Sequence, residues 1–130
     1  MISERDRLRE LVGIAAGALM EAEVESITGA GYHVTSQSRR AQRNGYRASS
    51  WRTSLGPIPL DIPKLRRGSY RPRWLRHADT TLIRAVAEAY AGSQVSPGWL
   101  AELTRALGLS GLTSDQREEV LTVLREEIAA

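Results

Sequence analysis

Hydrophobic positions recur every three to four residues at the start of the chain, which predicts a helix over residues 3 to about 28. The predicted stripe consists of Leu8, Leu11, Val12, Ala15, Leu19, Ala22 and Ile27. Ser3 is expected to cap this helix. Gly13 and Gly17 lie four residues apart on one face, where a partner helix would find room for a close approach, although two simply tolerated glycines are the preferred interpretation.

The middle of the chain alternates apolar and polar residues, which predicts a β-hairpin. Residues 46–54 form the first expected strand, Gly56-Pro57 the turn, and residues 58–62 the return strand with its even positions on one apolar face. Prolines at 57, 59 and 63 cannot donate to a ladder, so this strand is expected at an edge. Tyr46 and Trp51 should point to opposite faces, and at most one of them joins the apolar face.

The last third predicts three short helices. One runs from Asp79 to Tyr90, the next begins at Ser96-Pro97 and ends at Leu107, and the last opens with a capping-box pair of Thr113 and Gln116. The apolar positions of the last helix are Val120, Leu121, Val123, Leu124 and Ile128. Helices of this size suit a helix-turn-helix-like bundle, and they equally suit any small helical bundle.

These elements predict an α+β fold with three parts. An N-terminal helix occupies residues 1–33, a two-stranded basic β-hairpin region residues 34–77, and a three-helix, helix-turn-helix-like bundle residues 78–130. Residues 34–45 are expected to form a loop, and residues 64–75 a second basic connector.

Charge is distributed unevenly along the chain. The stretch from Gln37 to Arg76 contains eleven of the 18 Lys and Arg residues but only one acid, Asp61, whereas the whole chain has a net charge of only +3. Ten of these eleven cations are arginine, which binds phosphate through two parallel hydrogen bonds. The aromatic residues interleaved with them are Tyr46, Trp51, Tyr70 and Trp74. This mixture predicts a nucleic-acid contact surface; the alternative is an arginine-rich solvated face without a partner.

The candidate DNA-binding residues all lie within this basic stretch. They are Arg39, Arg40, Arg43, Asn44, Tyr46, Arg47, Arg52, Lys64, Arg66, Arg67, Arg71 and Arg73.

The composition predicts no catalytic, metal or cofactor site. The chain has no cysteine, which excludes disulfides, thiolate zinc sites and cysteine nucleophiles. Its two histidines, His33 and His77, have no metal-ligand spacing, and no phosphate-binding glycine motif occurs. The longest apolar run, residues 11–20, is too short for a membrane span. With no targeting signal at the start, a cytoplasmic protein is expected.

Two motifs in the basic stretch carry a family resemblance. Residues 43–47 read Arg-Asn-Gly-Tyr-Arg, and residues 56–72 read Gly-Pro-Ile-Pro-Leu-Asp-Ile-Pro-Lys-Leu-Arg-Arg-Gly-Ser-Tyr-Arg-Pro. Both resemble the N-terminal region of Mutator-type bacterial insertion-sequence transposases. Ala89-Tyr90 and Ala106-Leu107-Gly108 match the dipeptide and tripeptide that frame the next helical segment of that family, so the resemblance extends over residues 20–116.

The resemblance implies that this region binds the terminal inverted repeats of a mobile element. In that family a separate downstream domain cuts and joins DNA with an Asp-Asp-Glu set that holds two divalent metals. Because the chain ends at Ala130, before such a domain would begin, it is expected to bind DNA without catalysis, as a truncated or decayed transposase. The expected partners are double-stranded DNA, a full-length transposase or a second copy of the chain, and no membrane.

The last helix departs from the family pattern. Ser114 and Glu119 stand where the family has lysine and arginine, and Asp115 and Glu118 add further negative charge near the helix start. Phosphate would repel these acids. Either this helix does not read a DNA groove, or sequence readout is lost and only the electrostatic contact remains. The alternative function is an oligomerising protein-interaction or RNA-binding module without sequence-specific DNA binding.

Overall fold

The computed structural model describes residues 3–29, 43–65, 68–77, 79–92, 94–109 and 111–129. Its elements follow the order α1 (Glu4–Gly29), β1 (Arg43–Thr53), β2 (Gly56–Leu65), α3 (Arg73–His77), α4 (Asp79–Gly92), α5 (Pro97–Ala106) and α6 (Ser114–Ala129). The predicted α+β class is confirmed, with an N-terminal helix, an antiparallel hairpin and several C-terminal helices. The division into three parts stays a prediction, and one hydrophobic core contains residues from α1, β2, α4, α5 and α6.

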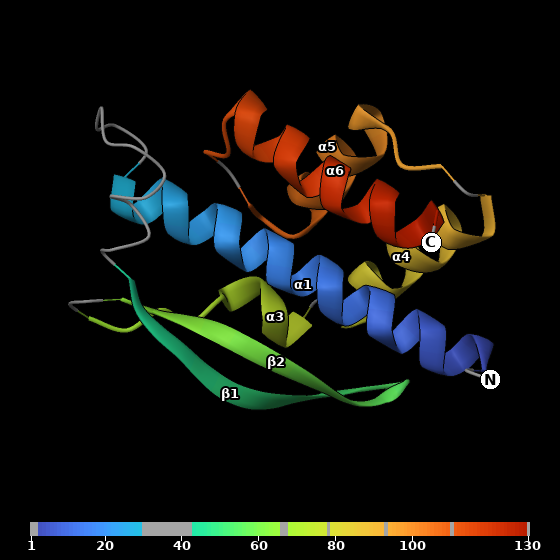
Figure 1. Ribbon diagram of the computed structural model, residues 1–130, viewed down its shortest axis with the longest axis horizontal. Coiled ribbons are helices and arrows are strands. Elements are labelled where there is room, and N and C mark those ends of the chain that lie inside the picture. The colour runs from blue at the N-terminus through green and yellow to red at the C-terminus, as the bar shows by residue number, and fades with distance from the viewer. Residues whose placement is uncertain are drawn as a thin grey trace.

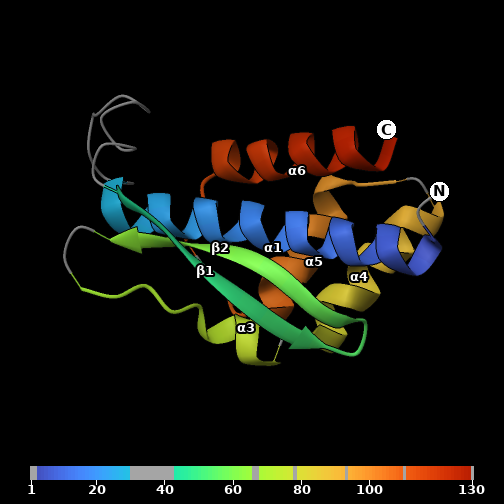
Figure 2. The ribbon, with the colours of Figure 1, turned by 60° about the horizontal axis from the view of Figure 1, so that its bottom comes forward.

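Helix α1 lies at the centre of the molecule, between α6 on one side and the hairpin on the other (Figures 1 and 2). The Ser3 hydroxyl accepts the Asp6 amide N–H at 3.1 Å, which confirms the predicted cap. Seven residues of α1 are completely buried, namely Leu11, Val12, Ala15, Ala16, Leu19, Met20 and Val24. This set is wider than the predicted stripe because α1 packs against β2, α4 and α6 rather than against one partner.

Two apolar positions of the predicted helices are exposed. Ile27 is 58% exposed, and it belongs to the last turn of α1, which extends beyond the start of α6 (Figure 1). Val123 in α6 is 38% exposed, because α6 buries only one side against the rest of the molecule. An apolar position on a helix is therefore buried only where a neighbouring element covers it.

A two-residue loop, Ser54–Leu55, joins the two strands of the hairpin. The turn was predicted two residues later, at Gly56-Pro57. Gly56 pairs with Thr53 and has φ of +98°, a left-handed conformation that favours glycine. The register places Trp51 opposite Ile58, and the predicted apolar face of Ile58, Leu60 and Ile62 is buried. The sheet has two strands among the described residues, so both are edges, which accommodates the prolines of β2.

Gly13 allows a close approach, but the approaching element is a strand. A Cβ atom at Gly13 would lie 3.2 Å from Cγ2 of Ile58, whereas a Cβ at Gly17 would meet nothing within 4 Å. The idea of a partner helix at both glycines is therefore wrong within this chain, since β2 occupies the space beside Gly13.

Helices α5 and α6 begin where their capping residues predict. The Ser96 hydroxyl accepts the Trp99 amide N–H at 3.1 Å, with Pro97 at the first helical position. Thr113 and Gln116 exchange two hydrogen bonds of 2.8 and 3.1 Å, which is the predicted capping box. The short helix α3 is the exception, because residues 64–75 were expected to form a connector without a helix.

Candidate nucleic-acid interface

Strand β1 is the outer element of the hairpin. In Figure 1 β2 lies between α1 and most of β1. Residues 45–50 are all exposed, so both faces of β1 are open over this stretch. The register places Arg47 opposite Ile62 and Arg52 opposite Pro57, on opposite faces of the ribbon. A ribbon of this kind presents cations on either side of its free edge.

We define the basic surface as six exposed cations of the hairpin and the segment that follows it: Arg47, Arg52, Lys64, Arg71, Arg73 and Arg76. The hairpin and residues 68–77 lie on the side of α1 that faces away from α6 (Figures 1 and 2). Within the described part of the chain, none of the six makes an ion pair or a side-chain hydrogen bond. Their charges are therefore available to an external anion.

Cations elsewhere in the chain behave differently. Five of the seven arginines outside the basic stretch donate to protein acceptors, namely Arg5, Arg7, Arg9, Arg117 and Arg125. Arg7 and Arg9 also form ion pairs with Glu10 and Asp6, with N–O distances of 2.6 and 2.7 Å. These five arginines are bound to acceptors within the protein, whereas the cations of the basic surface are not.

Residues 70–74 show how two of the free arginines are held outward. Burial alternates strictly along this segment: Tyr70, Pro72 and Trp74 are buried, while Arg71 and Arg73 are exposed. The two arginines therefore project from a segment whose alternate residues are docked in the core.

A carboxylate on α1 anchors this segment. The Glu23 Oε1 atom accepts a hydrogen bond from the Tyr70 hydroxyl and another from the Trp74 indole Nε1 at 3.0 Å. Burial, together with the neighbouring Glu23 carboxylate, raises the pKa of the Tyr70 phenol well above its usual range. The phenol therefore stays protonated and keeps donating to Glu23. We call Glu23, Tyr70 and Trp74 the anchor.

Sequence reasoning missed Glu23 and misjudged its two partners. Tyr70 and Trp74, each 6% exposed, are not available to stack on bases, although they were grouped with the contact surface. One signal was present in the sequence: Glu23 follows Leu19 by four residues and so shares the buried side of α1.

The remaining predicted contact residues are five arginines, Asn44 and Tyr46. Arg39, Arg40, Arg66 and Arg67 lie outside the described residues, and Arg43 and Asn44 are the first two residues of β1.

Tyr46 is 51% exposed, but its hydroxyl donates a hydrogen bond to Glu21 of α1 at 2.6 Å, so its side chain is held against the protein. Trp51 is the aromatic that shares the apolar face, and it packs partly buried against the core. Trp99 is likewise structural, since its indole donates to the Ala85 carbonyl at 3.1 Å.

Helix α6 lies on the other side of α1 from the hairpin (Figure 2). Asp115, Glu118 and Glu119 are all exposed. This placement favours the interpretation in which α6 does not read DNA, because α6 lies on the other side of α1 from the hairpin that carries Arg47 and Arg52. Among the described residues there is no cluster of three or more acidic or histidine side chains that could hold a metal ion. No described helix has the length and hydropathy needed to cross a bilayer.

Comparison with known proteins identifies the family. The sequence pattern described as "Transposase, Mutator family" matches residues 1–130. The chain belongs to the Mutator family of transposases. It is 38% identical over 129 residues to the "Transposase for insertion sequence element IS1081" of Mycobacterium tuberculosis (strain ATCC 25618 / H37Rv), and equally to the protein of the same title from Mycobacterium bovis (strain ATCC BAA-935 / AF2122/97).

Each match to a curated Mutator transposase covers 96% of this chain but only 31% of the relative. No solved structure matches the chain significantly. The similarity confirms the resemblance seen in the two hairpin motifs. Because the chain spans less than a third of these relatives, their complete activity is not carried over to it.

Proposed function

We propose that this region binds duplex DNA through the basic surface, and that in the transposase it recognises the terminal inverted repeats of the mobile element. The supporting observation is the contrast in how arginines are used. Arg47, Arg52 and the other cations of the basic surface have no partner among the described residues, while most arginines elsewhere are bound to protein acceptors. Unpaired arginines concentrated in the hairpin and the segment that follows it fit a phosphate backbone.

The physical basis of the proposal is counterion release. Each phosphate neutralised by a protein cation contributes a slope of about −0.9 to a plot of log affinity against log salt concentration. If about five to seven of the cations in the basic stretch reach phosphates, the total slope is roughly −4.5 to −6.

The test is a salt titration of Arg71→Ala with Arg73→Ala, measured by fluorescence anisotropy with a labelled duplex. Losing two phosphate contacts should flatten the slope by about 1.8, so the affinity advantage of the unmodified chain shrinks roughly tenfold between 50 and 200 mM salt. The matched control is Arg84→Ala with Arg105→Ala, which removes two exposed arginines from α4 and α5. This control should retain most of the affinity and slope.

Two results would overturn the proposal. One is an unchanged slope in the Arg71 and Arg73 variant. The other is a larger loss in the Arg84 and Arg105 variant, which would assign DNA binding to the helices instead. Sequence recognition is tested separately, by comparing a duplex from the end of the element IS1081 with an unrelated duplex of equal length. That these 130 residues do not themselves cut DNA stays a prediction, tested by incubating labelled duplex with the chain and Mg²⁺.

A further inference from the structure

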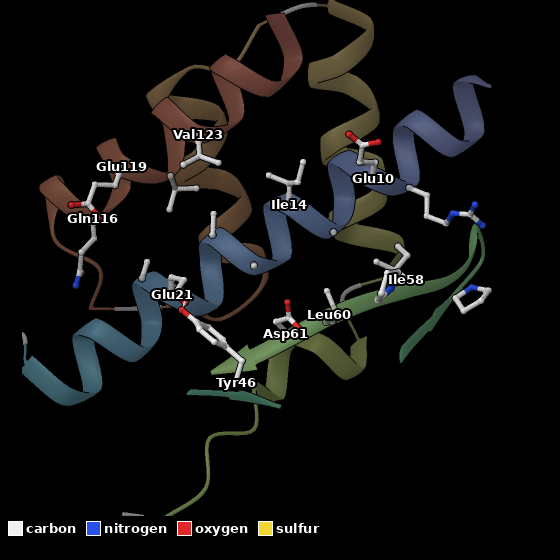
Figure 3. A pocket seen from close by; sticks show the side chains of 18 of the residues that line it. Glu10, Ile14, Glu21, Tyr46, Ile58, Leu60, Asp61, Gln116, Glu119 and Val123 are labelled. Atoms are coloured by element: carbon white, nitrogen blue, oxygen red, sulfur yellow. Dashed lines mark hydrogen bonds between the residues drawn. The ribbon is translucent and has the colours of Figure 1, made fainter. Parts of the chain in front are cut away.

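A second surface differs from the basic surface because it is apolar and acidic. It is a groove of about 1020 Å³ between α1, β2 and α6. Its apolar lining comes from all three elements, including Ile14 and Ala18 of α1, Leu60 of β2 and Val120 and Val123 of α6 (Figure 3). Of the three large hydrophobic residues that are markedly exposed among those described, Tyr46 and Val123 both line it. The groove therefore concentrates the exposed apolar surface of the molecule.

The charge of the groove is opposite to that of the basic surface. Its lining contains five acids, Asp6, Glu10, Glu21, Asp61 and Glu119, but a single cation, Arg9. Arg9 is already paired with Asp6. Asp61 points from β2 toward α1, and neither Asp61 nor Glu119 has a hydrogen bond or ion pair within the described chain (Figure 3). A polyanion would be repelled here, whereas a cationic partner would be attracted.

The backbone beside the groove favours a helix over a strand as the occupant. An added strand would need N–H donors from β2, but two of the β2 residues that line the groove, Pro57 and Pro59, have none. A helix satisfies its own backbone hydrogen bonds and needs only an apolar trough. Gly17 on the groove floor has open space at its Cβ position, so a helix is able to approach α1 closely there.

A symmetric contact between two grooves is disfavoured by their charge. Such a dimer would place five acids of one copy against the same five acids of the other. In addition, the apolar stripe of α1 is largely buried within one chain. We propose that the groove is a docking site for a cationic amphipathic helix of a partner protein, whose apolar side enters between Ile14 and Val123 and whose Lys and Arg residues meet Asp61 and Glu119.

The test uses a defined probe, an 18-residue labelled peptide of leucine and lysine with leucines at helical spacing. Its binding to the 130-residue chain is measured by fluorescence anisotropy. Gly17→Leu should weaken binding at least tenfold, because the new side chain fills the groove floor, and its Cβ atom would meet no other atom within 4 Å. Gly92→Leu is the matched control, since that helical glycine also has open space around its Cβ position but does not line the groove. It should bind the peptide as the unmodified chain does.

Charge and self-association are tested in the same series. Asp61→Lys with Glu119→Lys should weaken peptide binding at least tenfold, and a peptide of the same composition with scrambled order should bind weakly. The proposal is overturned if the unmodified chain does not bind the ordered peptide, if Gly17→Leu binds it equally well, or if the scrambled peptide competes equally. Sedimentation showing a dimer that Gly17→Leu dissociates would assign the groove to a second copy instead. DNA binding by Gly17→Leu should be unchanged, so failure here is distinguishable from failure of the proposed DNA contact.

Discussion

The anchor offers the sharpest test of how this fold presents its arginines. Both hydrogen bonds end on one atom, Glu23 Oε1, and both donors belong to side chains that are only 6% exposed. Glu23→Ala leaves the Tyr70 hydroxyl and the Trp74 indole N–H buried without an acceptor. An unsatisfied buried donor costs about 1–3 kcal/mol, so this substitution should lower the free energy of unfolding by about 2–6 kcal/mol. That is a large fraction of the ~5–15 kcal/mol typical of a domain.

Glu23→Gln separates the hydrogen bonds from the charge. The amide oxygen has two lone pairs and can accept from both donors, so the geometry is preserved while the acceptor becomes neutral. We expect this variant to lose only about 1–2 kcal/mol, the difference between a charged and a neutral acceptor. Glu102→Ala, which removes an exposed acid from α5, serves as the control for loss of charge and should change stability by less than about 0.5 kcal/mol.

Urea unfolding followed by circular dichroism at 222 nm measures these differences, and Tyr70→Phe completes a double-mutant cycle. Alone, Tyr70→Phe should cost about 1.5–3 kcal/mol, because it removes a hydrogen bond to a charged acceptor. In the Glu23→Ala background it should cost nothing or restore up to about 1–3 kcal/mol, since it removes a buried hydroxyl that has already lost its acceptor. Additive effects within about 0.5 kcal/mol would show that the two side chains do not act together, and the anchor would be refuted.

Two further predictions concern pH and the helix glycines. The pKa of Tyr70 is raised in the folded chain, so this group stabilises the fold fully below the ordinary tyrosine pKa of about 10, and stability falls above it by up to ~1.4 kcal/mol per pH unit. Denaturation between pH 9 and 11 should therefore show a shallower loss for Tyr70→Phe, and equal slopes would contradict the assignment. Gly17→Ala should stabilise α1 by about 1 kcal/mol, seen as a higher Tm, because no atom obstructs the new methyl group. Gly13→Ala should gain less or lose stability, since its Cβ would lie 3.2 Å from Cγ2 of Ile58, and a greater gain at Gly13 than at Gly17 would refute this packing.

Local signals in the sequence determined most of the secondary structure. The caps at Ser3, Ser96 and Thr113 are each confirmed by hydrogen bonds between residues three apart, and the alternating apolar residues of β2 are buried as predicted. Such features depend on nearest neighbours, so they can be recognised without knowing the fold. The hairpin motifs also sufficed to identify the Mutator family.

Only the tertiary structure decided which charged and aromatic residues face outward. Tyr70 and Trp74 lie among arginines in the sequence, yet both are buried because Glu23, about fifty positions earlier, supplies their acceptor. The acidic groove likewise exists only because α1 brings β2 and α6 together, from segments nearly sixty positions apart. Contacts between distant positions leave no periodic trace in the sequence. Packing, and not composition, therefore decided which cations are exposed and unpaired, and it also formed the acidic groove.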